Sequence, residues 1–332
     1  MWNCPLLFVL LPLAVLALPP LNEEVDEWRF FVTTHQKTYS TKAEEAKRFG
    51  IFMENLRLAK KRAAKEQGTA TFGIDKFSDM TVEEFRTTRL MNKKLVSHLK
   101  RGAIKKMVSE KAYECGGLPK SFDWRDHHAV TGVKDQGQCG SCWAFSTAAN
   151  IESVYAVKKG KLYSLSEQEI VDCDSENSGC SGGWPIQAMK DIEKLGGLEK
   201  EDEYKYEAED DKCRFNKSEV VVQISDAVSL SHNEDKIAAY LVQHGGVSVA
   251  FNAEDSIMGY TGGIVKLGYD ECSSSDIDHA VLLVGYGTEN DVPFWIVKNS
   301  WGADWGESGY FRIFRGGNTC GIAEDAVSAV VN

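Results

Sequence analysis

The sequence predicts an α+β protein in which helices come first and an antiparallel sheet follows. Apolar residues recur at spacings of three and four over residues 44–66, and residues 142–159 form a second, more apolar helical stretch. Residues 220–314 instead carry short apolar runs separated by Gly-rich turns, which is typical of strands. A chain of 332 residues that is 43% hydrophobic can build two domains with real cores.

The first 18 residues differ from the rest because they are uncharged and mostly apolar. The run is short for a bilayer span, and small residues near Ala17 offer a cleavage site, so we expect a signal peptide over 1–18. No later stretch reaches transmembrane length, so we expect no membrane span in the mature chain. Entry to the secretory pathway permits disulfides among the eight cysteines that remain after Cys4 leaves, and glycosylation at the sequon of Asn216.

Residues 19–117 carry the first helical pattern. Its apolar side includes Phe49, Phe52, Met53, Leu56 and Ala59, and Gln67-Gly68 is expected to end it. Thr81-Val82-Glu83-Glu84 fits a capping box at the start of another helix. Residues 90–115 are rich in lysine and predict an extended linker that proteases can reach.

Charge divides the chain into two parts. Residues 18–117 hold 20 Lys+Arg and 14 Asp+Glu, a balance of +6, whereas residues 118–332 hold 18 and 35, a balance of −17. Opposite signs favour attraction between the two parts, although simple solvation of both is an open alternative. The acidic part makes nucleic acid a poor partner.

Cys142 begins the helix expected over 142–159, which Gly160 ends. Backbone N–H groups and the helix dipole at that terminus favour an anion, so we expect the thiolate to be stabilised. A thiolate attacks carbonyl carbon, and the amide of Gln136 with the N–H of Cys142 would hold the oxyanion that forms.

Cys139-Gly140-Ser141-Cys142 also has the C-x-x-C spacing of redox pairs and half zinc sites. A βαβ context is absent, and no second pair of cysteines or histidines completes a metal cage. We therefore expect neither a metal nor a cofactor.

His279 and Asn299 each stand beside an expected core strand. The strands are predicted at Val220–Ile224, Val247–Phe251, Ala280–Val284, Phe294–Val297 and Tyr310–Phe314. A lone histidine is more often structural, but an asparagine amide can fix one imidazole nitrogen and leave the other for a thiol. Trp301 would shield that bond from water.

These segments together resemble the papain-like (C1) family of cysteine peptidase precursors. Cys139-Gly140-Ser141-Cys142-Trp143 is the local signature of papain and the cathepsins. Leu118–Arg125, Gly179–Gly183 and Asn299–Gly302 resemble the mature N-terminus, the substrate-binding turn and the asparagine motif. The resemblance implies a helical left domain and an antiparallel, barrel-like right domain over 118–332, behind a helical inhibitory prosegment over 19–117.

By that resemblance Cys142 is the nucleophile, His279 the base and acid, Asn299 the orienting residue and Gln136 the oxyanion donor. The prosegment narrows the branch, since Ala59 and the segment Lys76–Thr81 are more similar to cathepsin F than to cathepsin L. The motif residues carried over are Glu44, Arg48, Phe52, Asn55 and Ala59.

The resemblance also implies three disulfides, which spacing alone does not give. The pairs are Cys139 with Cys180, Cys173 with Cys213, and Cys272 with Cys320. Cys142 stays free, and Cys115 has no assigned role.

Substrate contacts follow from the same resemblance. Gly183 and Asp278 would hold the substrate backbone, and the pocket for the second residue before the cut would be lined by Trp184, Pro185, Ala250 and Ile277, with Trp301 beside the site. Asp325 matches the floor of that pocket, where an acid would admit Arg beside Leu or Phe. A solvated C-terminal charge is an equal alternative for Asp325.

The expected protein is a monomeric endopeptidase made as a zymogen, activated in acid and lysosomal or secreted. Its partners would be protein and peptide substrates, its own prosegment and cystatin-type inhibitors. His127-His128 precede Cys142 without an insertion, so they are interpreted as surface residues. The alternative class is a secreted binding module, which turnover dependent on Cys142 would exclude.

Overall fold

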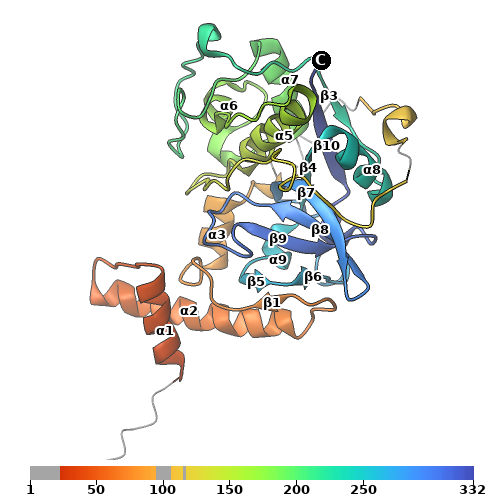
Figure 1. The fold of residues 1–332 in the computed structure, drawn as a ribbon. Helices are drawn as coiled ribbons and strands as arrows, with labels where there is room; N and C mark the ends of the chain where they lie inside the picture. The colour runs from red at the N-terminus through yellow and green to blue at the C-terminus, as the bar shows by residue number, and fades with distance from the viewer. Residues whose placement is uncertain (1–22, 95–105, 115–116) are drawn as a thin grey trace, which may run out of the picture.

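The computed structural model describes residues 23–94, 106–114 and 117–332, so the expected signal peptide and Cys115 lie outside the described residues. The described part starts with α1 (Glu23–Thr34), at the lower left of Figure 1, and α2 (Lys42–Ala63), which runs beneath the main body beside β1 (Thr71–Phe72). They pack on each other through an aromatic cluster whose buried members are Trp28, Phe31, Phe52 and Leu56.

The helix expected over 44–66 is α2, which ends earlier than Gln67-Gly68. The carboxylate of Glu66 accepts the N–H of Gly68 at 2.7 Å and that of Lys266 at 2.6 Å. The chain therefore leaves the helix after Ala63 in order to bond to the body of the protein. It then pairs β1 (Thr71–Phe72) with β5 (Tyr260–Gly262), and α3 (Val82–Arg89) starts at the expected capping box of Thr81 and Glu84.

The upper part of Figure 1 is helical. It contains α5 (Cys142–Lys159), α6 (Glu167–Cys173) and α7 (Pro185–Leu195), with the short 3-10 turns η2 (Gly179–Ser181) and η3 (Lys217–Glu219). The helix predicted over 142–159 has those bounds, and Gly160 ends it in the left-handed conformation with φ 67°.

The remaining strands form one sheet in the order β3-β10-β4-β7-β8-β9-β6, with β2 paired to β7. It is antiparallel except for the parallel β6–β9 pair. Its strands are β2 (Phe122–Asp123), β3 (Asp226–Ser229), β4 (Val247–Phe251), β6 (Ile264–Val265), β7 (His279–Glu289), β8 (Val292–Lys298), β9 (Tyr310–Phe314) and β10 (Asp325–Val330). The remaining elements are α8 (Glu234–His244), α9 (Ala253–Ser256), η1 (Glu110–Tyr113) and η4 (Thr319–Gly321).

One predicted strand is wrong. Residues 220–224 form no strand, because the N–H groups of Val221 and Val222 both reach the carbonyl of Leu198. The segment thus bridges a loop instead of joining the sheet, and its apolar residues face the helical core.

Two apolar cores flank the position where prosegment and body meet. One lies among α5, α7 and the adjoining strands, and the other lies among the sheet, α8 and α3. Met91 belongs to the first core and Leu90 to the second, so the chain after α3 crosses between them. The expectation of an exposed linker from residue 90 is therefore wrong for its start, since both side chains are buried. Within the described residues, no helix is long and apolar enough to cross a membrane.

Candidate active site

Cys142 is the first residue of α5 and is fully buried. Within the described part of the chain it is the one cysteine outside a disulfide. The preceding loop is fixed by the Cys139–Cys180 disulfide and by the N–H of Gly140, which donates to the Cys180 carbonyl at 2.9 Å. A Cβ on Gly140 would lie 2.5 Å from that carbonyl oxygen, so the close approach requires glycine.

His279 opens β7, and its Nε2 lies 2.7 Å from Oδ1 of Asn299. The same Oδ1 accepts the backbone N–H of Ser300 at 2.8 Å, which identifies it as oxygen and makes Nε2 the donor. Nδ1 of His279 has no hydrogen-bond partner in the structure. The Trp301 ring lies over the imidazole at 4.7 Å between centroids, and it is fully buried. The imidazole thus has Nε2 fixed by Asn299 and Nδ1 without a hydrogen-bond partner.

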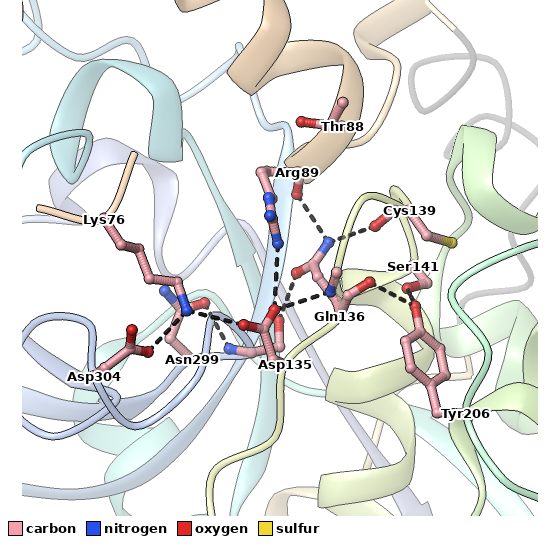
Figure 2. Close-up of polar contacts among 12 residues, drawn as sticks. Lys76, Thr88, Arg89, Asp135, Gln136, Cys139, Ser141, Tyr206, Asn299 and Asp304 are labelled. Carbon is pink, nitrogen blue, oxygen red and sulfur yellow. Dashed lines mark hydrogen bonds and ion pairs between the residues drawn. The ribbon is translucent and has the colours of Figure 1, made fainter. Parts of the chain in front are cut away.

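Gln136 is buried, and its side-chain amide is committed at both ends. Ser300 Oγ donates to Oε1 at 2.7 Å, so Nε2 is the donor end. Nε2 bonds the Cys139 carbonyl at 2.8 Å and the carbonyl of Arg89, the last residue of α3, at 3.0 Å (Figure 2). A carbonyl of the N-terminal segment therefore occupies the donor that sequence reasoning assigned to an oxyanion.

Burial sets the protonation of the reactive pair in this covered state. It raises the pKa of the Cys142 thiol to about 12 and lowers the pKa of His279 to about 4, although the Asn299 bond favours the charged imidazole. Both shifts favour the neutral thiol and the neutral imidazole in the precursor, where the two side chains are fully buried. The thiolate expected at this helix terminus stays a prediction for the mature enzyme.

That segment is held along the site by backbone bonds. The N–H of Met91 donates to the carbonyl of Asp278 at 2.7 Å, and that of Asn92 to the carbonyl of Ser181 at 3.2 Å. The carbonyls of Asp278 and Ser181 therefore hold the backbone of the N-terminal segment in the precursor. That Gly183 and Asp278 hold the backbone of a substrate stays a prediction.

The residues expected to line the specificity pocket lie together. Trp184, Ala250 and Ile277 belong with Met91 to one buried cluster, and Pro185 begins α7 next to Trp184. A Cβ on Gly183 would lie 2.5 Å from the Trp143 ring, so this turn also requires glycine. Met91 of the N-terminal segment thus shares a buried apolar cluster with the expected pocket residues.

Asp325 is half-buried at the start of β10 and pairs with Ala250 of β4. This half-buried position beside Ala250 differs from that of a fully solvated terminal charge, and a role of Asp325 in the pocket stays a prediction. The Asp278 carboxyl is fully buried, and burial raises its pKa to about 7 although Lys93 lies 3.3 Å away.

The structure contains the three disulfides that the family resemblance implies: Cys139–Cys180, Cys173–Cys213 and Cys272–Cys320. His127 and His128 are exposed, and so is Asn216. No group of three or more His, Cys, Asp or Glu side chains that could hold a metal ion occurs among the described residues.

Cations of the N-terminal segment meet carboxylates of the body. Lys76 bridges Asp135 at 2.9 Å and Asp304 at 2.8 Å, and Arg89 also reaches Asp135 at 3.2 Å (Figure 2). Arg86 of α3 makes a two-point bond with Glu254, at 2.7 and 2.8 Å. The attraction expected from the +6 and −17 balances is therefore made of specific contacts.

Sequence reasoning missed Ser300 and Arg89. Ser300 fixes the amide of Gln136, and its place directly after Asn299 is a weak signal for such a role. The part played by Arg89 is carried by its carbonyl, which every residue has, so no residue type could have shown it.

The helical N-terminal segment, the two cores and the Cys–His–Asn site define a cysteine protease precursor, and the chain belongs to the papain family. Residues 118–330 match the model of the papain family cysteine protease, and residues 28–85 match that of the cathepsin propeptide inhibitor domain.

Among individual relatives the chain is similar to cathepsin F. It is 46% identical to cathepsin F of Mus musculus over 302 residues, covering 91% of this chain and 64% of that protein. It is 43% identical to cathepsin F of Drosophila melanogaster, covering 89% of this chain and 48% of that protein. The chain thus spans between about half and two thirds of these relatives.

The fold matches that of solved precursors. Digestive procathepsin L 3 of Tenebrio molitor superposes with a TM-score of 0.80 at 40% identity, covering 93% of this chain and 99% of that one. Residues 28–85 therefore belong to a propeptide of the cathepsin type.

Proposed function

We propose that this chain is the zymogen of a cysteine endopeptidase that hydrolyses peptide bonds through Cys142, His279 and Asn299. The observation that carries the proposal is the commitment of the imidazole, with Nε2 held by Asn299 and Nδ1 left free. A base with one nitrogen fixed and the other open is what activation of a thiol requires.

In the proposed reaction the Cys142 proton passes to Nδ1 of His279, and the thiolate sulfur attacks the carbonyl carbon. The oxyanion accepts bonds from the Gln136 amide and the Cys142 N–H. The imidazolium then protonates the departing amine as the C–N bond breaks, which leaves a thioester. Water gives a proton to the same imidazole and hydrolyses the thioester, so the thiol is restored.

Specificity would come from the apolar residues that share a buried cluster with Met91 in the precursor. Trp184, Ala250 and Ile277 provide apolar walls that suit Leu or Phe at the second residue before the cut. Asp325, across from Ala250, would add acceptance of Arg. His127 and His128 lie exposed on the surface, which supports an endopeptidase over an exopeptidase.

Activation would occur in acid. The ion pairs of Lys76, Arg86 and Arg89 hold the prosegment at neutral pH, and protonation of their carboxylate partners would release it. Cleavage near residues 110–118 would then free the mature domain over 118–332.

The three disulfides fit an oxidising compartment, so we place the protein in the secretory pathway, either lysosomal or secreted. Exposed Asn216 would accept a glycan there. Cystatin-type inhibitors and a monomeric state belong to the same proposal.

The test is intact-mass analysis after acidification and treatment with a thiol-directed epoxide. We expect one adduct on Cys142 of a shortened chain, and peptide hydrolysis that is lost in Cys142→Ala. An adduct on Cys115 or none at all, together with no turnover, would favour a binding module instead.

A further inference from the structure

Tyr206 lies in the loop that follows α7, and its hydroxyl sits between two parts of the active-site loop (Figure 2). It donates to the backbone carbonyl of Gln136 at 2.8 Å and lies 2.5 Å from Oγ of Ser141. A phenol carries one proton, which goes to the carbonyl, so Ser141 must be the donor in the second bond. One hydroxyl thus joins the residue that holds the side-chain oxyanion donor to the residue that precedes the nucleophile.

Ser141 is the N-cap residue of α5, yet its side chain makes no cap bond. A serine at this position ordinarily accepts the N–H of the second or third helical residue. Here Ser141 Oγ lies in a fully buried position and donates to Tyr206 instead, so it does not cap the helix that begins at Cys142.

The ring of Tyr206 is itself fixed. It packs edge-on against Phe145 of α5, with centroids 4.8 Å apart and planes at 84°. The hydroxyl therefore has a defined position relative to the first turn of the helix, and Gln136 is held from both sides, by Ser300 on its amide and by Tyr206 on its carbonyl.

We propose that Tyr206 is a positioning residue for the oxyanion site, holding Gln136 and the first turn of α5 in register through one hydroxyl. The inference rests on the proposed peptidase function and assigns no contact between Tyr206 and substrate. Loss of the hydroxyl would let the two donors drift relative to each other, and small displacements at a reacting centre reduce turnover more than binding.

The test compares the mature forms of Tyr206→Phe and wild type after each is titrated with the epoxide, so that rates refer to reactive Cys142. We expect kcat to fall roughly tenfold while KM changes less than about twofold, because the ring and its packing stay in place. The matched control is Tyr204→Phe, in the same loop. The Tyr204 hydroxyl bonds Asp172 at 2.6 Å and accepts the N–H of Arg214, away from Cys142. The Tyr204→Phe variant should therefore have a lower thermal stability than wild type and an unchanged kcat.

A double-mutant cycle separates positioning from general loop stability. If Tyr206 acts through Gln136, then Tyr206→Phe should change kcat less than about twofold in a Gln136→Ala background. An equal loss in both backgrounds, or a kcat for Tyr206→Phe within twofold of wild type, overturns the inference while the peptidase function stands. Absence of turnover in wild type refutes both.

Discussion

Hydrogen bonds to individual atoms fix the orientation of the side chains in the site. Oδ1 of Asn299 accepts from both the His279 ring and the Ser300 backbone, which leaves one orientation for the amide and one for the imidazole. Gln136 is fixed in a similar way, because Ser300 Oγ donates to its Oε1 and its Nε2 donates to the carbonyls of Cys139 and Arg89. The imidazole and the amide are therefore already oriented in the precursor, and the Arg89 carbonyl must leave the amide before an oxyanion can bind there.

Replacing Asn299 with Ala should lower kcat of the mature enzyme by tenfold or more, about 1.4 kcal/mol of barrier. Without the Oδ1 acceptor the imidazole is free to turn and to protonate on the wrong nitrogen. Steady-state kinetics on titrated enzyme measures this, and Asn216→Ala at the exposed sequon is the control. An unchanged kcat would show that Trp301 packing alone orients the ring.

Replacing Asp325 with Asn should lower the preference for Arg over Leu, two residues before the cut, by about fivefold or more. The change keeps the shape of the side chain beside Ala250 and removes its charge. The measurement is the ratio of kcat/KM for paired peptides that differ at that position only. The control is Asp304→Asn, which removes a carboxylate that pairs with Lys76 of the prosegment. An unaltered ratio in Asp325→Asn would contradict the assignment of Asp325 to the pocket.

Among the elements, α3 has the largest role in keeping the site covered. Its capping box fixes where it starts, Arg86 on its body bonds Glu254, and its last carbonyl, on Arg89, occupies the Gln136 amide. The residues that follow place Leu90 and Met91 in the two cores. One short helix thus positions both Arg86, which bonds Glu254, and the segment of Leu90 and Met91 that follows it.

Replacing Arg86 with Ala should speed self-processing of the precursor about tenfold at a fixed acidic pH above 4, where Glu254 is still charged. The variant removes a half-buried two-point bond to a carboxylate, which contributes on the order of 1–2 kcal/mol. Gel densitometry over time measures the rate.

The matched control for this prediction is Arg57→Ala. Arg57 makes a similar two-point bond with Glu54, but that pair is exposed on α2 and does not cross to the body. Equal acceleration in both variants would mean that prosegment stability in general, and not the anchor on Glu254, limits processing.

For the whole molecule, pH acts through the ion pairs between the basic and acidic parts. Pairing with Arg86 lowers the pKa of Glu254. Burial opposes the shift at Asp135 and Asp226, but the lysines and N–H groups around them lower the pKa of Asp135 and bring that of Asp226 to about 2. A carboxylate with a lowered pKa stabilises the docked state above its ordinary pKa and loses that contribution as pH falls through the lowered value. Buried Asp278, with its raised pKa, has the opposite sign.

Prosegment release should therefore accelerate only as pH falls below about 4. Hydrogen exchange of α3 in a Cys142→Ala precursor, which cannot cleave itself, measures release without processing. Asp135→Asn should raise exchange at neutral pH and flatten the pH dependence. A release midpoint near pH 6 would contradict the carboxylate account and point to histidine titration.

Much of this protein is determined by local sequence. The helix at 142–159, the capping box at Thr81 and four of the five predicted strands follow from periodicity and turn residues, because these signals act over a few positions. The reactive cysteine and its helix terminus are likewise local. The family resemblance then supplied His279 and Asn299, which no spacing rule would have joined to it.

Only the tertiary structure shows which segments that are distant in the sequence contact one another. Residues 220–224 have the composition of a strand, but the N–H groups of Val221 and Val222 donate to the carbonyl of Leu198 and not to a strand of the sheet. The helix α2 stops at Ala63 because Glu66 bonds Lys266, which is 200 positions away. The burial of Cys142, the bond from the Gln136 amide to the Arg89 carbonyl and the position of Tyr206 depend on such contacts between distant segments. Burial and backbone pairing across the chain are properties of packing, and no residue type records them in advance.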